Sequence, residues 1–258
     1  MRNTVDFNPI KKECHWEHEQ KLFNYLEGKS VIIVGPAEYL IGQNKGEWID
    51  SFDVVVRLNL SCPVPVELKK DVGSRTDVLY HTLVRDQHIK AVPTVFKCHT
   101  RQEIIDWKKD GVKWVVLKNN LNWLHRKGTN MRVFANNISG VIRWTNVSGH
   151  KYRRLTYMTR KGPNTGTIAI YHLLFSKLKS LHVVGCDFHK TGYYTGYGGF
   201  SEEQAKLGQG GRGYWGQAGE KSKKGPHDIS TQIRYLKSVR DKRFKPDDVL
   251  EQIIAGVH

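Results

Sequence analysis

The sequence lacks the features of several protein classes. No hydrophobic run approaches the ~18 residues that a membrane-spanning helix needs. The chain begins with polar and charged residues instead of a hydrophobic leader. With 39% hydrophobic and 26% charged residues, the composition also excludes a disordered or collagen-like chain. We therefore expect a globular protein without a signal peptide or a membrane span, located in the cytoplasm.

Cysteine is scarce as well. The four cysteines are Cys14, Cys62, Cys98 and Cys186, and none is spaced as Cys-x-x-Cys. This pattern favours reduced and mostly packed thiols, with pairing and metal binding as the alternatives. Reduced thiols agree with a cytoplasmic location.

Acidic residues are absent from one long stretch. The chain has 41 Lys and Arg against 25 Asp and Glu, a formal net charge of +16. Residues 111–186 hold thirteen Lys or Arg and no Asp or Glu, whereas residues 1–30 hold five of each sign. Such a field attracts nucleic acid, an anionic membrane face or anionic small molecules. A solvated basic face that only aids solubility is the alternative.

The hydrophobic runs that do occur are short and continuous, which is typical of parallel strands buried on both faces. They predict strands at residues 30–34, 53–58, 77–80, 94–96, 114–117 and 181–185. Helical patterns lie between them, at residues 13–27, 102–109, 167–177 and 231–239. The alternation predicts one α/β domain over residues 1–258, with a Rossmann-like and mainly parallel sheet.

Two positions in this scheme are suited to an anionic ligand. The first strand ends at Gly35-Pro36, where the Gly-x-Gly-x-x-Gly fingerprint of dinucleotide sites is missing, which argues against NAD. Ligands of open α/β sheets still bind at the carboxyl ends of strands. At Asn164-Thr165-Gly166 a helical pattern begins, and its N–H groups form an anion site unless this is a plain helix start.

A glycine-rich segment and a histidine follow. Residues 192–219 hold ten glycines and six aromatic residues, and a loop of this length favours an active-site lid. His227 comes between this segment and a helical pattern. A loop histidine is most often a surface residue. Its position beside a lid favours a general base, since an unperturbed pKa of about 6.5 suits that task.

Several stretches, in this order, resemble the sialyltransferases. Residues 32–35, 49–59 and 71–76 resemble the large sialyl motif of glycosyltransferase family 29, and residues 163–166 and 182–185 resemble its small motif. The C-terminal part is similar to the bacterial sialyltransferases of family 42, in which residues 185–188 and 227–236 match in spacing. The resemblance covers roughly residues 30–240.

The resemblance implies an inverting transferase on a variant of the GT-A type fold. Its donor would be a CMP-sugar that carries sialic acid or a related 2-keto acid sugar, and its acceptor a glycan or glycolipid hydroxyl. His227 would be the base, with His189 and Tyr194 assisting the leaving phosphate. The residues implied at the donor are Gly35, Pro36, Asn59, Asn164, Thr165, Gly166, Gly185, Arg212 and Tyr214.

Three positions depart from the family pattern. Pro36 stands where the large motif usually has Asn, and proline lacks the N–H and the amide of that residue. Gly213 stands where the third motif has His, and Gln232 where an acidic residue follows the base. The sequence also contains no Asp-x-Asp, and a monophosphate leaving group needs a metal less than a diphosphate does. We therefore expect neither a metal nor another cofactor.

Two alternatives rest on the basic stretch. One is a glycosyltransferase of the same fold that modifies nucleic acid or uses another nucleotide sugar. The other is a non-catalytic, basic nucleic-acid-binding protein, for which aromatic residues should alternate with basic ones. Trp114, Trp123, Trp144, Tyr152 and Tyr157 partly meet that condition. The ordered motifs and His227 favour the CMP-sugar enzyme, with its basic stretch toward an anionic acceptor at the inner membrane face.

Overall fold

The protein is built on one parallel sheet. The computed structural model describes residues 16–82, 99–118, 136–197 and 227–256. Its strands are β1 (Ser30–Val34), β2 (Val54–Leu58), β3 (Val78–His81), β4 (Trp114–Leu117), β5 (Arg143–Asn146), β6 (Ser180–Val184) and β7 (Phe244–Pro246). Every neighbouring pair is parallel. The predicted α/β class and the parallel sheet are confirmed.

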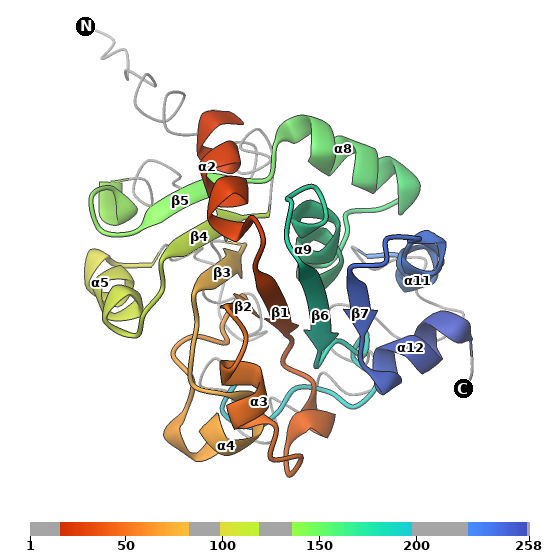
Figure 1. Ribbon diagram of the computed structural model, residues 1–258, viewed down its shortest axis with the longest axis horizontal. Coiled ribbons are helices and arrows are strands. Elements are labelled where there is room, and N and C mark those ends of the chain that lie inside the picture. Colours follow the sequence, from red (N-terminus) through yellow and green to blue (C-terminus); the bar gives the residue numbers. More distant parts are fainter. Residues whose placement is uncertain (1–15, 83–98, 119–135, 198–226, 257–258) are drawn as a thin grey trace, which may run out of the picture.

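The strand order creates a switch point beside β1. The seven strands lie in the order β5-β4-β3-β2-β1-β6-β7, side by side across Figure 1. The chain thus winds outward from β1 to β5 and then returns to the other side of β1. The loops after β1 and β6 are joined by a bridge between Ala37 and Tyr193. The carboxyl ends of the strands at such a switch point are where open α/β sheets bind ligands.

Helices cover both faces of the sheet because alternate strand residues enter opposite cores. Val31 and Ile33 face one core, and Ile32 and Val34 face the other. The first core is covered by α2 (Trp16–Leu26), α8 (Gly149–Met158), α9 (Thr165–Leu173), α11 (Ile229–Ser238) and α12 (Asp248–Ala255). The second is covered by α3 (Gly46–Asp50), α4 (Lys69–Val72), α5 (Arg101–Lys109) and the 3-10 helices Glu38–Leu40 and Val66–Leu68.

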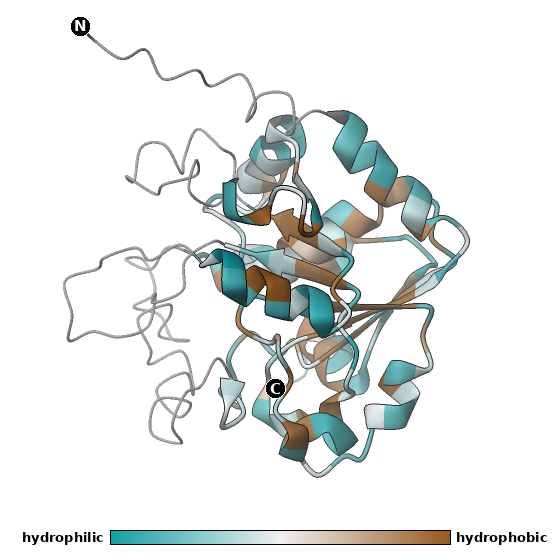
Figure 2. Cartoon of the chain, turned by 90° about the vertical axis from the view of Figure 1, so that its left-hand side faces the viewer, coloured by the Kyte–Doolittle hydropathy of each residue, from teal (hydrophilic) through white to brown (hydrophobic). Residues whose placement is uncertain are grey.

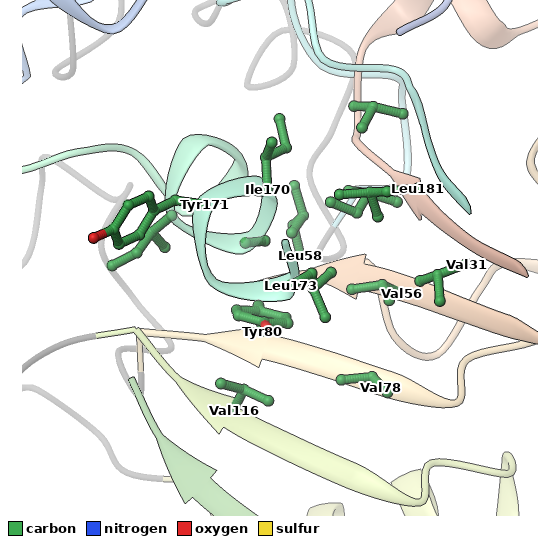
Figure 3. Packing of buried hydrophobic residues seen from close by; sticks show 14 of the residues in the cluster. Val31, Val56, Leu58, Val78, Tyr80, Val116, Ile170, Tyr171, Leu173 and Leu181 are labelled. Carbon is green, nitrogen blue, oxygen red and sulfur yellow. The ribbon is translucent and has the colours of Figure 1, made fainter. Parts of the chain in front are cut away.

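Hydrophobic burial places α9 directly on the middle of the sheet. Figure 2 shows the strands as the most hydrophobic part of the chain, between helices with hydrophilic outer surfaces. In Figure 3, Leu173 of α9 lies beside Tyr80 and Val56 of the strands, and these side chains belong to one buried cluster. The N-terminus of α9 is therefore held at a fixed position over the carboxyl ends of the strands. Within the described ranges, no helix is long and apolar enough to cross a membrane.

The predicted elements and the structure differ mainly at the edges. Strands β1 to β4 and β6 and helices α2, α5, α9 and α11 match predictions, whereas the predicted strand at 94–96 lies outside the described residues. The sequence analysis missed β5 and β7, the two edge strands. Arg143–Asn146 is mostly polar, and Phe244–Pro246 ends in proline, which only an edge strand tolerates. Helices α8 and α12 were also missed.

Two glycines bring the ends of β1 and β6 together. The Gly35 N–H donates to the Val184 carbonyl at 2.8 Å. A Cβ atom on Gly35 would lie 2.1 Å from the carbonyl oxygen of Gly185. Gly185 itself has a φ of 71°, a left-handed conformation that favours glycine. No larger residue fits at this crossing without moving a strand end.

Gly35→Ala should therefore lower the free energy of unfolding by about 3 kcal/mol or more, the upper range for overpacking. Gly28→Ala is the matched control. Gly28 has a φ of 73° but nothing within 4 Å of an added Cβ, so only a left-handed backbone penalty of about 1 kcal/mol applies. Urea unfolding measures the free energy of unfolding of both variants. A loss for Gly35→Ala no larger than that for Gly28→Ala would contradict the close crossing.

Candidate active site

A cavity of about 460 Å³ lies at the carboxyl ends of the strands. Its wall includes residues that follow five strands: Pro36, Asn59, Thr82, Lys118 and Gly185. The first turn of α9 and the histidine that precedes α11 complete the wall. The cavity thus occupies the switch point that the strand order defines.

The start of α9 gives the cavity a site for an anion. Asn164 caps the helix, and its side-chain oxygen accepts from the Thr167 N–H at 2.7 Å. The backbone N–H groups of Thr165 and Gly166 lie in the first turn, where an α-helix provides no carbonyl acceptor for them. The helix dipole adds positive potential at the same place. Asn59 has a φ of 52°, and its side-chain amide donates to the Thr165 hydroxyl at 3.1 Å. The end of β2 and the start of α9 therefore form one polar wall.

His227 is held in a single tautomer. Its Nδ1 bonds the carbonyl oxygen of Gly162. A carbonyl can only accept, so Nδ1 carries the proton and Nε2 has the lone pair. Burial, and then the positive charge of Lys118, lower the pKa of His227 from 6.5 to about 3. The imidazole is therefore neutral around pH 7, with its lone pair on Nε2. Its proton affinity is lower than that of the unperturbed histidine that the sequence predicted.

Gln232 ties the start of α11 to the start of α9. Its side chain is 0% exposed. The side-chain oxygen accepts from the Asn164 N–H at 2.9 Å, and the side-chain nitrogen donates to the Asp228 carbonyl at 3.2 Å. A carboxylate at this position could not donate to Asp228. The amide that departs from the family pattern thus performs a task that an acidic residue cannot.

The loop after β6 is held in a strained conformation. Phe188 and His189 have φ values of 56° and 67°, a region that bulky residues rarely occupy. The Asp187 carboxylate holds the turn, accepting from the His189 N–H at 2.9 Å and from the Thr191 N–H at 2.6 Å. The His189 ring lies 5.2 Å from the Tyr193 ring. Burial lowers the pKa of His189, so this ring is also neutral.

The structure brings most of the predicted site residues together. The residues that line the cavity are Pro36, Asn59, Asn164, Thr165, Gly166, Gly185, His189 and His227. Gly35 is not in the wall and packs against Gly185. Arg212, Tyr214 and Gly213 lie outside the described residues, and so does the predicted lid beyond residue 197.

The prediction for Tyr194 needs correction. Its side chain is 1% exposed and packs in the core cluster on the other face of the sheet, close to the Arg57 guanidinium. Tyr193 and Tyr197 line the cavity instead. The turn at Pro36, whose carbonyl accepts from the Tyr194 N–H at 3.0 Å, directs the tyrosines in this way. Tyr193 and Tyr197, and not Tyr194, are therefore the tyrosines of this loop that face the cavity.

Sequence reasoning missed other residues of the wall. Lys118 directly follows a predicted strand, so the rule about strand ends could have identified it. Tyr152 and Thr156 come from α8, for which the sequence offered no signal of a site. Cys62 and Cys186, the two cysteines of the described ranges, form no disulfide. In the same ranges no group of His, Cys, Asp or Glu could hold a metal ion.

The comparisons with known proteins identify the family. The model of glycosyltransferase family 29 (sialyltransferase) matches residues 7–171, more than half of the chain. The chain belongs to glycosyltransferase family 29. Its parallel α/β sheet agrees with the Rossmann-like fold that the sequence predicted. The similarity to family 42 remains a prediction.

Two solved structures of a mammalian sialyltransferase are similar to this family 29 glycosyltransferase. One is a complex with Gal-beta-1-3GalNAc-ortho-nitrophenol. Each is 15% identical over 92% of this chain and 80% of that chain, with TM-scores of 0.44 and 0.45. No curated protein matches the chain in sequence.

The lowered pKa of His227 predicts the acid side of the pH profile. A base with a pKa of about 3 stays unprotonated far below 6.5, so kcat/KM of the family 29 enzyme should show no acid limb near pH 6.5. Stability should still decrease as the pH falls below 6.5, because histidines of the unfolded chain bind protons there and the buried ones do not. Circular dichroism at each pH separates the two effects. A limb near 6.5 in a fully folded enzyme would contradict the burial of His227.

Proposed function

We propose that this glycosyltransferase moves sialic acid or a related 2-keto acid sugar from a CMP-sugar to a glycan or glycolipid hydroxyl, with inversion and with His227 as general base. One observation carries the proposal. A neutral His227 whose Nδ1 proton is fixed on the Gly162 carbonyl shares a cavity with the N-terminus of α9. A proton acceptor and an anion site are the two groups that this reaction needs.

The nucleotide fits the end of the cavity beside β1 and β6. Gly185 lines that end, where the absence of a side chain lets a ligand approach the backbone. The amides of Thr165 and Gly166 provide hydrogen-bond donors for the phosphate. Pro36 offers no N–H, so the phosphate contacts in this chain come from α9 and from the loop after β6.

The chemistry follows from this placement. As the acceptor oxygen bonds to the anomeric carbon, His227 Nε2 takes the hydroxyl proton and the bond to the CMP phosphate breaks. CMP leaves with the bonding electron pair, and the donors at the start of α9 stabilise its growing negative charge. His189 and Tyr193 provide further donors at that end of the wall. The leaving group is a monophosphate, so we propose a reaction without a metal or another cofactor.

Helix α8 favours an anionic acceptor. Tyr152 and Thr156 line the cavity from this helix, whereas Arg153 and Arg154 are exposed to solvent. The Tyr157 side chain is 87% exposed. One helix thus connects the cavity to an exposed basic and aromatic surface. We propose that this surface binds an anionic glycan or a glycolipid at an anionic membrane face, because its charges are complementary.

The function is tested first by ligand binding and then by substitution. CMP in hundredfold excess over its Kd should stabilise the chain by roughly 2.7 kcal/mol, whereas UMP, GDP and NAD should not. His227→Gln should keep this stabilisation and reduce turnover with CMP-sialic acid by roughly 10²–10⁴-fold. His18→Gln, a histidine of α2 outside the cavity wall, is the matched control.

Two outcomes would contradict the proposed function. One is near wild-type turnover of His227→Gln in a folded protein. The other is an enzyme that excess EDTA inactivates and Mg²⁺ or Mn²⁺ restores, since that would place a metal in the reaction. The turnover assay is therefore run with and without EDTA.

The acceptor surface is tested by removing two charges. Arg153→Ser with Arg154→Ser should raise KM for a sialylated or phosphorylated acceptor and leave KM for the donor unchanged. Lys69→Ser with Lys70→Ser on α4 removes the same charge from exposed positions outside the cavity wall. The increase should diminish at high salt, which screens exposed charges. Tight, salt-sensitive binding of duplex DNA together with transfer to DNA would instead support a nucleic-acid acceptor.

A further inference from the structure

Lys118 is a buried cation without an anionic partner among the residues that the structure describes. The residue is 8% exposed and directly follows β4 in the cavity wall. By contrast, the mostly buried Lys151 of α8 is paired with the Glu19 carboxylate. No acidic side chain in the described part of the chain pairs with Lys118, and burial alone lowers its pKa to about 8. Burying an unpaired ammonium costs free energy, so its presence in a cavity points to an anionic ligand.

The position of Lys118 separates it from the glycine end of the cavity. Strand β4 is two strands beyond β2, with β3 between them, whereas Pro36 and Gly185 follow β1 and β6. At about 4.8 Å between neighbouring strands, the end of β4 is roughly 14 Å from the end of β1. Lys118 is nevertheless close enough to His227 for its charge to lower the histidine pKa. It therefore stands nearer to the base than to the glycine end of the cavity.

We propose that Lys118 binds the carboxylate of the transferred sugar and selects 2-keto acid sugars as donors. This inference rests on the proposed function. A CMP-linked 2-keto acid sugar carries two anionic groups, the phosphate and a carboxylate on the anomeric carbon. The backbone amides at the start of α9 bind the phosphate. Among the described residues of the wall, Lys118 is the sole Lys or Arg, and it lies close to His227, the proposed base that takes the proton of the acceptor hydroxyl.

The carboxylate contact also places the anomeric carbon. An ammonium holds a carboxylate through a charge-assisted hydrogen bond, which is shorter and stronger than a neutral one. With the phosphate at α9 and the carboxylate at Lys118, the sugar is fixed at two points. Its anomeric carbon then lies between the anion site and His227, as in-line displacement requires. Lys118 acts here as a substrate-binding residue and takes no proton.

The test compares three ligands with Lys118→Met, which keeps the length of the side chain and removes the charge. The ligands are CMP, CMP-sialic acid and an analogue whose carboxylate is replaced by a carboxamide. Wild-type protein should bind the carboxylate donor roughly 10- to 100-fold more tightly than the carboxamide, the range for hydrogen bonds to charged groups. In Lys118→Met this preference should vanish, while the Kd of CMP should stay unchanged.

Two controls separate the contact from a structural effect. Lys108→Met removes the same charge from an exposed position on α5 and should leave all three dissociation constants unchanged. The apo form of Lys118→Met should unfold at the same temperature as wild type or a higher one, because it no longer buries an unpaired charge. A change in ligand preference in an equally stable protein cannot come from misfolding.

Each remaining outcome would overturn the proposal. If Lys118→Met binds CMP more weakly by the same factor as it binds the donor, Lys118 contacts the phosphate. If donor binding is unchanged and KM for an anionic acceptor increases, the acceptor supplies the anion. If wild type binds CMP and the donor while Lys118→Met retains full preference for the carboxylate, only the assignment of Lys118 fails. If wild type binds neither ligand, the proposed function fails and this inference fails with it.

Discussion

The close crossing of Gly35 and Gly185 is the constraint on which the site depends. It joins the ends of the two strands at which the direction of winding changes. The Gly185 N–H donates to the Tyr39 hydroxyl at 2.6 Å, and Tyr39 also bonds Asp247 at the start of α12. The loop after β6 is thereby fixed with respect to β1 and α12. The strained turn at Phe188 and His189 can exist only on such a rigid base.

The electrostatic potential within the cavity depends on which polar and charged groups have a partner within the protein. The Asp187 carboxylate is fully engaged by the turn that it holds, through the backbone of His189 and through Thr191. His227 and His189 are neutral because they are buried. The start of α9 and Lys118 are left with positive potential, and no anionic side chain of the described residues pairs with them. Groups left in this state are typical of binding sites, where a ligand completes them.

The sequence predicted the elements whose signal is local. Continuous hydrophobic runs identified the central strands, since burial on both faces requires hydrophobic side chains at every position. The edge strand Phe244–Pro246 carries no such signal, because only its neighbour β6 defines it. Helix α12 had a readable signal in its Asp247 cap, its Leu250 and Ile253 spacing and its terminal Gly256, which the analysis overlooked.

Site residues that belong to a local sequence pattern could be predicted. Site residues whose position depends on the tertiary structure could not. Asn164 and His227 were predicted in the site, and both line the cavity, because a helix cap and a histidine just before a helix have characteristic positions in a sequence. Tyr193 and Tyr194 are adjacent, and only the backbone after β6 decides which one enters the core. The role of Gln232 depends on a contact between α11 and α9, which the sequence separates by 68 positions.

The central claim is that the switch-point cavity is the nucleotide site, and a crystal structure of the chain with CMP tests it most directly. The account predicts the phosphate on the amides of Thr165 and Gly166, with Gly185 beside the nucleotide and Nδ1 of His227 on the Gly162 carbonyl. A second hollow, lined by Trp48, His182 and Lys245, offers an alternative place for a ligand. CMP bound in that hollow, or bound in the cavity with its phosphate away from α9, would contradict the account.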